Sequence, residues 1–368
     1  MKILLISPKN KTVFNFRGDL VRDMIAYGHE VMVTGPNMDY VDDIMALGVS
    51  EFIHVPFVKD NTNIAGDLSY LKQLVRVMKE KKPDLVFGYT IKPVIYGSMA
   101  AKLAGVRHIH AMVTGLGRVY ASSGLKARMV RTITKMLYKM AFYACNNVIF
   151  QNEDDIEELV SGGYLPRRKT VLVNGSGVNM DRFIRTELPA EPVFLMVSRV
   201  IREKGVLEYC HAARAVKRTN PDARFILLGG FDSSIGALKP KDIQPFLDDG
   251  SIEFPGEVKD PVAFYHKASV FVLPSYYREG LPRTLLEAMS CGRSIVTTDW
   301  PGCRVPVEDG VNGYMVPVRD VDTLTDRLRR LASDEGLRTR MGNEAYASCA
   351  SRFEVSIINA RMRDALNY

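Results

Sequence analysis

The sequence lacks the marks of a disulfide-stabilised or membrane-spanning protein. Its few cysteines are Cys145, Cys210, Cys291, Cys303 and Cys349. They are odd in number, widely scattered and without a C-x-x-C pair, which argues against a disulfide framework or structural zinc and favours a reducing compartment. The opening apolar run, residues 3–6, is followed by Ser7-Pro8 and is too short for a signal-peptide core or a membrane span. We therefore expect a cytoplasmic protein.

Low-complexity tracts and fixed-period repeats are also lacking, so the composition is that of a globular protein. The length of 368 residues exceeds what one core usually supports and favours two domains. Short apolar runs alternate with longer amphipathic segments, as expected for parallel strands joined by crossover helices. In the first half these runs are KILLIS, HEVMVTG, EFIHVPF, DLVFGYT, HIHAMVTG, NNVIFQN and TVLVNG. In the second half they are VFLMVS, RFILLGG, SIEFPG, VFVLPS and SIVTTD.

This series predicts an α/β protein with two doubly wound, Rossmann-like domains that face each other across a cleft. The boundary is expected near the Pro- and Glu-rich stretch 187–192. We expect an N-terminal domain over 1–186, a C-terminal domain over 187–350, and a last helix over 351–368 that packs back on the N-terminal domain. Because ligands of such sheets bind beyond the carboxyl ends of the strands, the cleft is the expected active site.

The net positive charge of the chain comes from its first half. Residues 1–180 contain 23 Lys and Arg against 16 Asp and Glu, whereas the remainder contains 26 of each. Such an imbalance indicates that the N-terminal half meets an anionic surface or ligand, with nucleic acid and anionic lipid as the candidates.

Two cations follow the strand predicted from VFLMVS. Arg199 leaves the strand end, and Lys204 stands just before a helix that we expect to begin near Val206. A guanidinium, an ammonium group and a helix N-terminus together suit a diphosphate. Taken alone, such residues are more often solvated surface charges.

A second motif, E-G-L-P-R-T-L-L-E, follows the strand predicted from VFVLPS. Glu279 and Gly280 form a turn, and Pro282 stands at about the first position of a helix, where a missing N–H is tolerated. We expect the backbone N–H groups of Gly280, Leu281 and the residues after them to face an anion. Glu287 lies in an apolar helix and needs a polar partner, such as the hydroxyls of a sugar or a ribose.

The joint pattern S-R-x-x-x-x-K-G and, about 75 residues later, E-G-x-P-x-x-x-x-E resembles the donor site of glycosyltransferase family 4, which has the GT-B fold. The resemblance covers essentially the whole chain. Residues 174–183, N-G-S-G-V-N-M-D-R-F, are similar to the interdomain turn of the family. Residues 254–258, F-P-G-E-V, are similar to the loop that contacts the nucleotide base.

The resemblance implies an enzyme whose C-terminal domain binds a nucleotide sugar, expected to be a UDP-sugar, and whose N-terminal domain binds the acceptor. The implied catalytic residues are Arg199, Lys204 and Glu279, and the implied donor-binding residues are Glu287, Gly280, Leu281, Pro282 and Val258. Arg199 and Lys204 would neutralise the diphosphate leaving group, Glu279 would contact the sugar and Glu287 the ribose. The family retains the anomeric configuration. Because preorganised cations stabilise the growing charge, and no Asp-x-Asp stands at a strand end, we expect neither a metal nor another cofactor.

The acceptor side is expected in the N-terminal half. Residues 113–127, V-T-G-L-G-R-V-Y-x-x-x-G-L-K-A, are similar to bacterial members that add an N-acetylhexosamine, such as N-acetylgalactosamine, to a polyprenyl-diphosphate-linked sugar. Many members carry a donor-contacting His at a turn where this chain has Thr114, which leaves the donor sugar open. The acceptor candidates are Asn15, Phe16 and Arg17, which we expect in the loop after the first strand, together with Lys92, Thr114 and Arg118.

A segment that begins at residue 124, GLKARMVRTITKMLYKMAFYA, is typical of an amphipathic helix. Its basic face is formed by Arg128, Arg131, Lys135 and Lys139, with apolar residues opposite. Such a helix can lie in the interface of an anionic membrane. A surface helix that packs its apolar face on the core fits equally well. The charge imbalance favours the membrane, and we expect peripheral association with the inner face of the cell membrane, with no nucleic acid as partner.

Three other classes were weighed against a transferase. A nicotinamide-dependent dehydrogenase requires a G-x-G-x-x-G after the first strand, and residues 7–18 contain none. A sugar-nucleotide 2-epimerase with the GT-B fold requires acid and base groups in the N-terminal domain, which the sequence does not identify. A non-catalytic partner subunit is disfavoured because Arg199, Lys204, Glu279 and Glu287 occur together.

Overall fold

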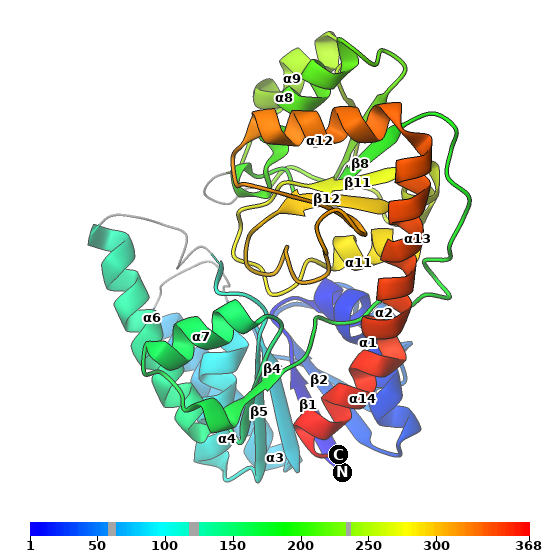
Figure 1. Ribbon diagram of the computed structural model, residues 1–368. Coiled ribbons are helices and arrows are strands. Elements are labelled where there is room, and N and C mark those ends of the chain that lie inside the picture. The colour runs from blue at the N-terminus through cyan, green and yellow to red at the C-terminus, as the bar shows by residue number, and fades with distance from the viewer. Residues whose placement is uncertain (58–63, 118–124, 233–236) are drawn as a thin grey trace. The chain divides into compact units, whose positions relative to one another are not determined.

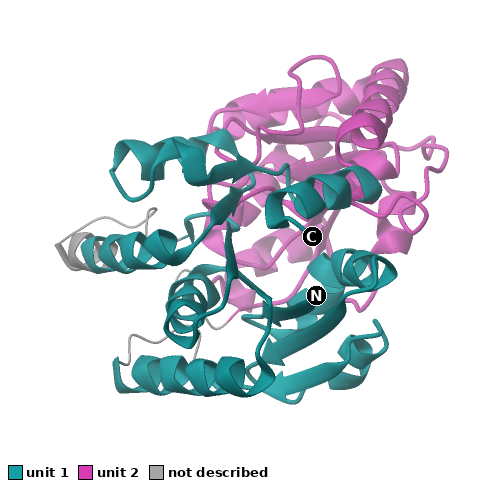
Figure 2. Cartoon of the chain, turned by 90° about the horizontal axis from the view of Figure 1, so that it is seen from below, with its two compact units in different colours: residues 1–176, 356–368 teal, residues 177–355 magenta. Residues whose placement is uncertain are grey.

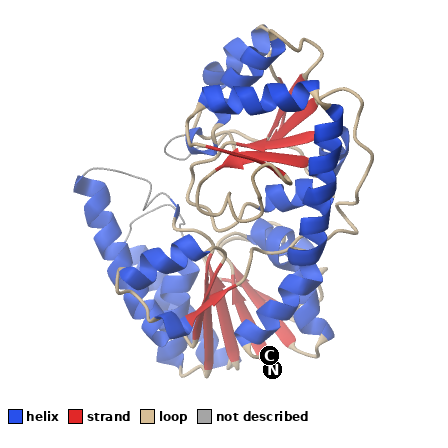
Figure 3. Cartoon of the chain, in the orientation of Figure 1, coloured by secondary structure: helices blue, strands red, loops and turns tan. Residues whose placement is uncertain are grey.

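The computed structural model describes residues 1–57, 64–117, 125–232 and 237–368, with only the backbone described over 125–131. The chain divides into two compact units (Figure 2). Unit 1 comprises Met1–Ser176 and Ser356–Tyr368, and unit 2 comprises Gly177–Val355. Each is a parallel sheet flanked by helices (Figure 3).

The sheet of unit 1 has seven described strands, all parallel, in the order β3-β2-β1-β4-β5-β6-β7 (Figure 1). They are β1 Lys2–Ile6, β2 Glu30–Gly35, β3 Glu51–His54, β4 Leu85–Tyr89, β5 His108–Val113, β6 Asn147–Phe150 and β7 Thr170–Leu172. Each apolar run predicted as a strand in the first half of the sequence forms one. The order reverses between β1 and β4, so the loops after these neighbouring strands lead to opposite faces of the sheet.

Helices cover both faces of this sheet. They are α1 Asn10–Ala26, α2 Val41–Met45, α3 Ile64–Lys81, a π-helix Pro93–Gly97, α4 Ser98–Ala104, α6 Leu125–Ala144, α7 Glu153–Ser161 and α14 Val355–Leu366. Ile3 and Leu5 of β1 pack with residues of α1 and α14, whereas Leu4 and Ile6 pack with residues of α3 and α4. Burial on both faces explains the continuous apolar strands. Within the described residues, none of the helices is both long and apolar enough to cross a bilayer.

The prediction of a loop over residues 9–17 is wrong. Helix α1 already begins at Asn10, so the connection from β1 is limited to residues 7–9. Val13, Leu20 and Met24 are buried at helical spacing. The polar residues at the start of α1 conceal this pattern. Asn15, Phe16 and Arg17 therefore lie on a helix.

Unit 2 has six described strands, also parallel, in the order β10-β9-β8-β11-β12-β13. They are β8 Val193–Val197, β9 Arg224–Leu228, β10 Glu253–Gly256, β11 Val270–Leu273, β12 Ser294–Thr298 and β13 Gly313–Val316. Five were predicted from apolar runs. The sixth, β13, was missed because its apolar segment is short and lies between Gly313 and Pro317. The order reverses between β8 and β11, which makes their carboxyl ends the topological switch point of this sheet.

The helices of unit 2 include two that follow the sequence motifs. The described helices are α8 Val206–Lys217, α9 Pro240–Asp248, α10 Val262–Lys267, α11 Arg283–Ser290, α12 Val321–Ser333 and α13 Glu335–Arg352. Helix α8 begins at Val206 as predicted. Helix α11 begins at Arg283, so Pro282 is its N-cap and not, as expected, its first residue.

The two units meet in sequence between Ser176 and Gly177, ahead of the stretch 187–192. Hydrogen bonding explains why residues 177–186 belong to unit 2. The Val178 amide donates to the Phe353 carbonyl at 2.9 Å, and the Ser290 hydroxyl donates to the carbonyl of the buried Phe183 at 2.6 Å. The last segment, Ser356–Tyr368, belongs to unit 1.

A polar contact fastens α14 to unit 1 and generates a prediction. Nη1 of Arg363 lies 2.7 and 2.8 Å from the two carboxylate oxygens of Asp23 on α1, and both side chains are mostly buried. We expect Arg363→Met to destabilise unit 1 by about 1 kcal/mol, because a charge-assisted hydrogen bond is lost. Circular dichroism during unfolding measures the loss of stability, and hydrogen exchange shows whether α14 is affected.

The matched control is Arg22→Met on the exposed side of α1. Arg22 contacts Asp19 at 3.5 Å, and its side chain is 59% exposed. This exposed pair contributes little, so equal destabilisation by the two substitutions would contradict the role of Arg363.

Candidate functional site

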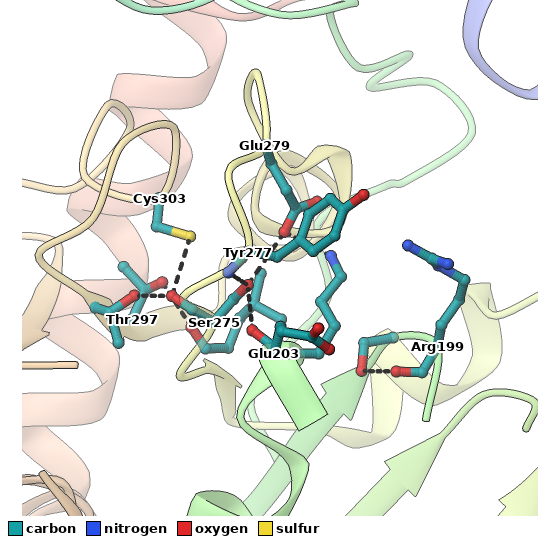
Figure 4. Close-up of polar contacts among 11 residues, drawn as sticks. Arg199, Glu203, Ser275, Tyr277, Glu279, Thr297 and Cys303 are labelled. Atoms are coloured by element: carbon teal, nitrogen blue, oxygen red, sulfur yellow. Dashed lines mark hydrogen bonds and ion pairs between the residues drawn. The ribbon is translucent and has the colours of Figure 1, made fainter. Parts of the chain in front are cut away.

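Arg199 stands just beyond β8, beside the loop that follows β9. Its Nη1 lies 2.6 Å from Oδ2 of Asp232. Its guanidinium lies 5.7 Å from the ring centre of Tyr277, and both side chains are drawn in Figure 4. Burial disfavours the Arg199 charge, but the hydrogen bond to Asp232 and the electrostatic attraction of Tyr277, Asp232 and Glu279 outweigh burial, so the pKa of Arg199 lies above its ordinary value. The guanidinium therefore remains a permanent cation.

Lys204 ends the 3₁₀ turn Arg202–Lys204 and is nearly buried. Its Nζ lies 2.5 Å from Oε1 of Glu279, which also accepts from the Ser275 hydroxyl at 3.3 Å. Gly205, which precedes α8, has a φ of 76°, and a Cβ there would lie 2.1 Å from the Pro274 carbonyl oxygen. Only glycine fits, so the K-G pair places the ammonium group against the Glu279 loop.

The Glu279 loop is held by segments from two neighbouring strands. The Tyr276 amide donates to the Glu203 carbonyl at 2.9 Å, and the Thr298 hydroxyl, at the end of β12, donates to the Ser275 carbonyl. Gly302 has a φ of 82°, and a Cβ there would lie 2.5 Å from the Gly280 carbonyl oxygen. The same Cβ would lie 2.6 Å from the Glu279 carbonyl oxygen, so the peptides after Glu279 and Gly280 are both fixed by close backbone packing.

Glu287 lies in α11 with its carboxylate mostly buried. Its Oε2 accepts from the Tyr265 hydroxyl at 2.8 Å, and its Oε1 lies 3.2 Å from Nε of Arg283. Burial raises the pKa of Glu287, while the positive charge of Arg283 and the Tyr265 hydrogen bond oppose this rise. The polar partner that the sequence required is therefore supplied first by the protein, with lone pairs of both oxygens left for a further donor.

The remaining residues predicted to bind the nucleotide sugar also lie in unit 2. Gly280 and Leu281 are buried between Glu279 and the start of α11. Val258 is partly buried beyond β10 and packs on the core. A Cβ at Gly230 would lie 2.7 Å from Oε2 of Glu257, so the loops after β9 and β10 run close together.

The structure thus brings Arg199, Lys204 and Glu279 together at the switch point of unit 2. Sequence reasoning missed the partners of the site residues, which are Asp232 and Tyr277 at Arg199, and Tyr265 and Arg283 at Glu287. Asp232 had one available signal, since it follows the β9 run RFILL closely and loops after parallel strands carry ligand groups. Among the described residues, no group of three or more His, Cys, Asp and Glu side chains is placed to hold a metal.

Two of the acceptor candidates in unit 1, Lys92 and Arg17, make internal contacts. Lys92 pairs with Asp67 at 2.7 Å. Arg17 is 4% exposed and donates to the Ser176 hydroxyl and the Met112 sulfur, each at 2.9 Å. The other positions are Asn15, partly buried, Phe16, 41% exposed, and Thr114, which directly follows β5. Arg118 lies outside the described residues, as do the side chains of Arg128 and Arg131.

Two family models match the chain. Residues 2–152 match the model described as Glycosyl transferase 4-like, and residues 179–348 match the model described as Glycosyl transferases group 1. The boundary between the matches agrees with the division into units.

Two curated relatives are similar over most of their length. The N,N'-diacetylbacillosaminyl-diphospho-undecaprenol α-1,3-N-acetylgalactosaminyltransferase of Campylobacter jejuni is 28% identical, over 98% of this chain and 97% of the relative. The UDP-Gal:α-D-GlcNAc-diphosphoundecaprenol α-1,3-galactosyltransferase of Escherichia coli is 27% identical, over 84% and 81%.

Solved structures share the fold at low identity. Anabaena HepE in complex with UDP and glucose superposes with a TM-score of 0.79 at 18% identity, covering 100% of this chain and 99% of HepE. Sucrose-phosphate synthase of Thermosynechococcus elongatus superposes with a TM-score of 0.82 at 20% identity, covering 100% and 98%.

The fold and these matches define the class, and the chain is a glycosyltransferase with the GT-B fold. Within that class it belongs to glycosyltransferase family 4, as the motifs around Arg199 and Glu279 had indicated.

The Glu287 contacts predict a pH-dependent stability effect. We expect Tyr265→Phe to destabilise unit 2 by about 2 kcal/mol, because a buried carboxylate loses a hydrogen-bond donor. The loss is largest where Glu287 is ionised and shrinks as the pH falls through its raised pKa. Urea unfolding at several pH values, followed by the fluorescence of Trp300, the single tryptophan of the chain, measures it.

Tyr209→Phe is the matched control in the same unit. The buried Tyr209 hydroxyl lies 2.9 and 3.1 Å from the neutral carbonyls of Phe194 and Ile226. The stability that this variant loses should not vary between mildly acidic and neutral pH. The same pH profile for both variants would refute the proposed support of an ionised Glu287.

Proposed function

We propose that the protein transfers a sugar from a UDP-sugar to a polyprenyl-diphosphate-linked saccharide, with retention of the anomeric configuration and without a metal. The observation that carries this proposal is the convergence of Arg199, Lys204 and Glu279 at the switch point between β8 and β11. Doubly wound folds bind their ligands at this place.

The chemistry needs stabilisation of a leaving diphosphate. The bond between the anomeric carbon and the phosphate oxygen breaks, and its electron pair stays with UDP. An acceptor hydroxyl oxygen bonds to the anomeric carbon, and its proton passes to the leaving diphosphate. Arg199 and Lys204 offset the growing negative charge, and fixed cations do so without reorganisation. Glu279, held beside Lys204, is placed to accept hydrogen bonds from the sugar.

The nucleoside of the donor is assigned to Glu287 and to the loops around it. Glu287 accepts hydrogen bonds from the ribose hydroxyls, using the lone pairs that Tyr265 and Arg283 leave. Backbone groups of Gly280, Leu281 and Pro282 lie along the donor, and Val258 lies by the base. The complex of HepE with UDP and glucose, which has the same fold, supports a uridine nucleotide.

The acceptor assignment rests on the relatives. Both the Campylobacter jejuni and the Escherichia coli enzymes are named for sugars linked to diphospho-undecaprenol, and the first transfers N-acetylgalactosamine. We assign an N-acetylhexosamine, such as N-acetylgalactosamine, as the transferred sugar. The acceptor residues of unit 1 are then Asn15, Phe16, Arg17, Lys92, Thr114 and Arg118.

A donor panel tests this function. UDP-N-acetylgalactosamine, UDP-N-acetylglucosamine, UDP-galactose and a GDP-sugar are compared for nucleotide release with a polyprenyl-diphosphate-linked acceptor in EDTA. We expect release from a UDP-sugar. Lys204→Ala should lower kcat by about 100-fold, and Glu287→Ala should raise the donor KM by about tenfold.

Lys217→Ala is the control, since this partly buried cation of α8 donates to the Gly250 carbonyl, away from the motifs. Wild-type rates in both Lys204→Ala and Glu287→Ala would refute the assignment, as would activity that EDTA abolishes.

Helix α6 supplies the observation for a membrane contact. An apolar stripe at helical spacing is exposed, comprising Ile133 (53%), Met136 (69%), Met140 (50%) and Tyr143 (82%). The residues that the helix buries instead are Thr134, Tyr138, Ala141 and Phe142. The apolar face expected to pack on the core under the alternative interpretation is therefore largely solvent-facing in the described part of α6.

We propose that this stripe docks unit 1 on the inner face of an anionic membrane. Lys139 is exposed beside it, and Lys135 lies 4.8 Å from the Tyr164 ring centre. Lys169 donates to the carbonyls of Phe142 and Tyr143 at the end of the helix. An apolar stripe bordered by cations suits anionic headgroups, and with Arg128 and Arg131 it would bring the enzyme to a lipid-linked acceptor.

Liposome sedimentation tests the contact. The pair Met136→Glu and Met140→Glu should weaken binding to phosphatidylglycerol vesicles by at least about tenfold, because apolar area is lost and like charge is added. Met38→Glu, at a 61% exposed methionine elsewhere in unit 1, should leave binding unchanged. Absence of wild-type binding at moderate salt would end this proposal.

A further inference from the structure

Each cation of the proposed diphosphate site already has a carboxylate partner. Lys204 faces Glu279 at 2.5 Å, and Arg199 faces Asp232 at 2.6 Å. The proposed function gives Glu279 a second task at the sugar, but it gives Asp232 none. A diphosphate on Arg199 would meet the negative charge of Asp232 beside the same guanidinium.

The backbone places Asp232 beside Arg199. Beyond the ends of β8 and β9, the parallel ladder continues: the Ser198 amide donates to the Leu228 carbonyl at 3.0 Å, and the Val200 amide to the Gly230 carbonyl at 2.9 Å. The two loops approach so closely that a Cβ at Gly229 would lie 1.8 Å from the Ser198 carbonyl oxygen. The side chain of Asp232 is 21% exposed, against 50% for Arg199. The pair is therefore set by sheet register.

We propose that Asp232 is a specificity-determining residue, an inference that rests on the proposed function. Asp232 competes with phosphate oxygens for Arg199 and thereby discriminates against free UDP. The terminal phosphate of UDP has a second ionisation near pH 6 that a sugar ester lacks. At neutral pH, UDP therefore carries about one more negative charge than a UDP-sugar. Repulsion from Asp232 acts more strongly on the product than on the donor, which favours exchange of UDP for a fresh donor.

Tyr277 supports this exchange because its contact does not depend on Asp232. The ring contributes a cation–π attraction that holds the guanidinium in place when its carboxylate partner changes. Removal of the Asp232 charge should thus leave Arg199 positioned and available to phosphate oxygens.

Asp232→Asn tests the proposal with the full chain. Calorimetry measures the Kd of UDP, and steady-state kinetics measure the donor KM and the inhibition constant of UDP. We expect UDP to bind about tenfold more tightly to the variant, with a smaller change for the UDP-sugar and stronger product inhibition. Inorganic diphosphate, as a second probe, should show the same direction as UDP.

Asp326→Asn is the matched control. It removes the same charge from unit 2 at another Asp and Arg pair, in which Asp326 is 75% exposed and lies 3.4 Å from Arg329. Its UDP affinity should equal that of the wild type. In Asp232→Asn with Arg199→Met, the gain in UDP affinity should disappear. Trp300 fluorescence verifies that each variant is folded.

The outcomes separate the two proposals. If folded Asp232→Asn binds UDP with unchanged or weaker affinity, while Lys204→Ala still loses activity, the competition role is overturned and the transferase site stands. An equal gain for UDP and the UDP-sugar overturns the discrimination. If the wild type binds neither UDP nor a UDP-sugar, the proposed donor itself is refuted.

Discussion

The contact between Lys204 and Glu279 is the constraint on which the functional half of unit 2 depends. Two charges are removed from most of their water there, and that desolvation cost is offset only when the geometry is good and the remaining lone pairs are used. Gly205 lets the Lys204 segment approach Pro274, Gly302 lets the loop after β12 approach Gly280, and Ser275 adds a hydrogen bond. The close backbone packing therefore serves to hold an ion pair whose members have separate proposed roles, Lys204 at the phosphate and Glu279 at the sugar.

Much of this arrangement could be predicted from the sequence, because its signals are local. Apolar runs identify strands of a sheet buried on both faces, and the K-G and E-G motifs mark loops where parallel strands end. Where the apolar signal is brief, as in β13, or polar residues begin a helix, as in α1, the same reasoning fails. Element boundaries set by capping, such as Pro282, remain uncertain by a residue for the same reason.

The partners could not be predicted, because they depend on the register between strands distant in sequence. Asp232 reaches Arg199 through continuation of the β8 and β9 ladder, and Tyr265 reaches Glu287 from a different helix. Nothing in the local pattern around Tyr265 distinguishes it from a core aromatic residue. The motifs therefore identify the groups of the proposed donor site, whereas the partners that set their charge and orientation emerge only with the fold.

Helix α6 shows a second limit of prediction from the sequence. Its sequence fits a core-packed and a membrane-bound helix equally, because amphipathic periodicity specifies two faces without saying which one is buried. The fold shows which residues are buried: Tyr138 and Phe142 enter the core of unit 1, and Met136 and Tyr143 remain outside. Exposed methionine and tyrosine side chains on one stripe are costly in water unless another phase covers them. That cost, together with the basic excess of the first half, is the physical argument for the lipid surface proposed for this helix.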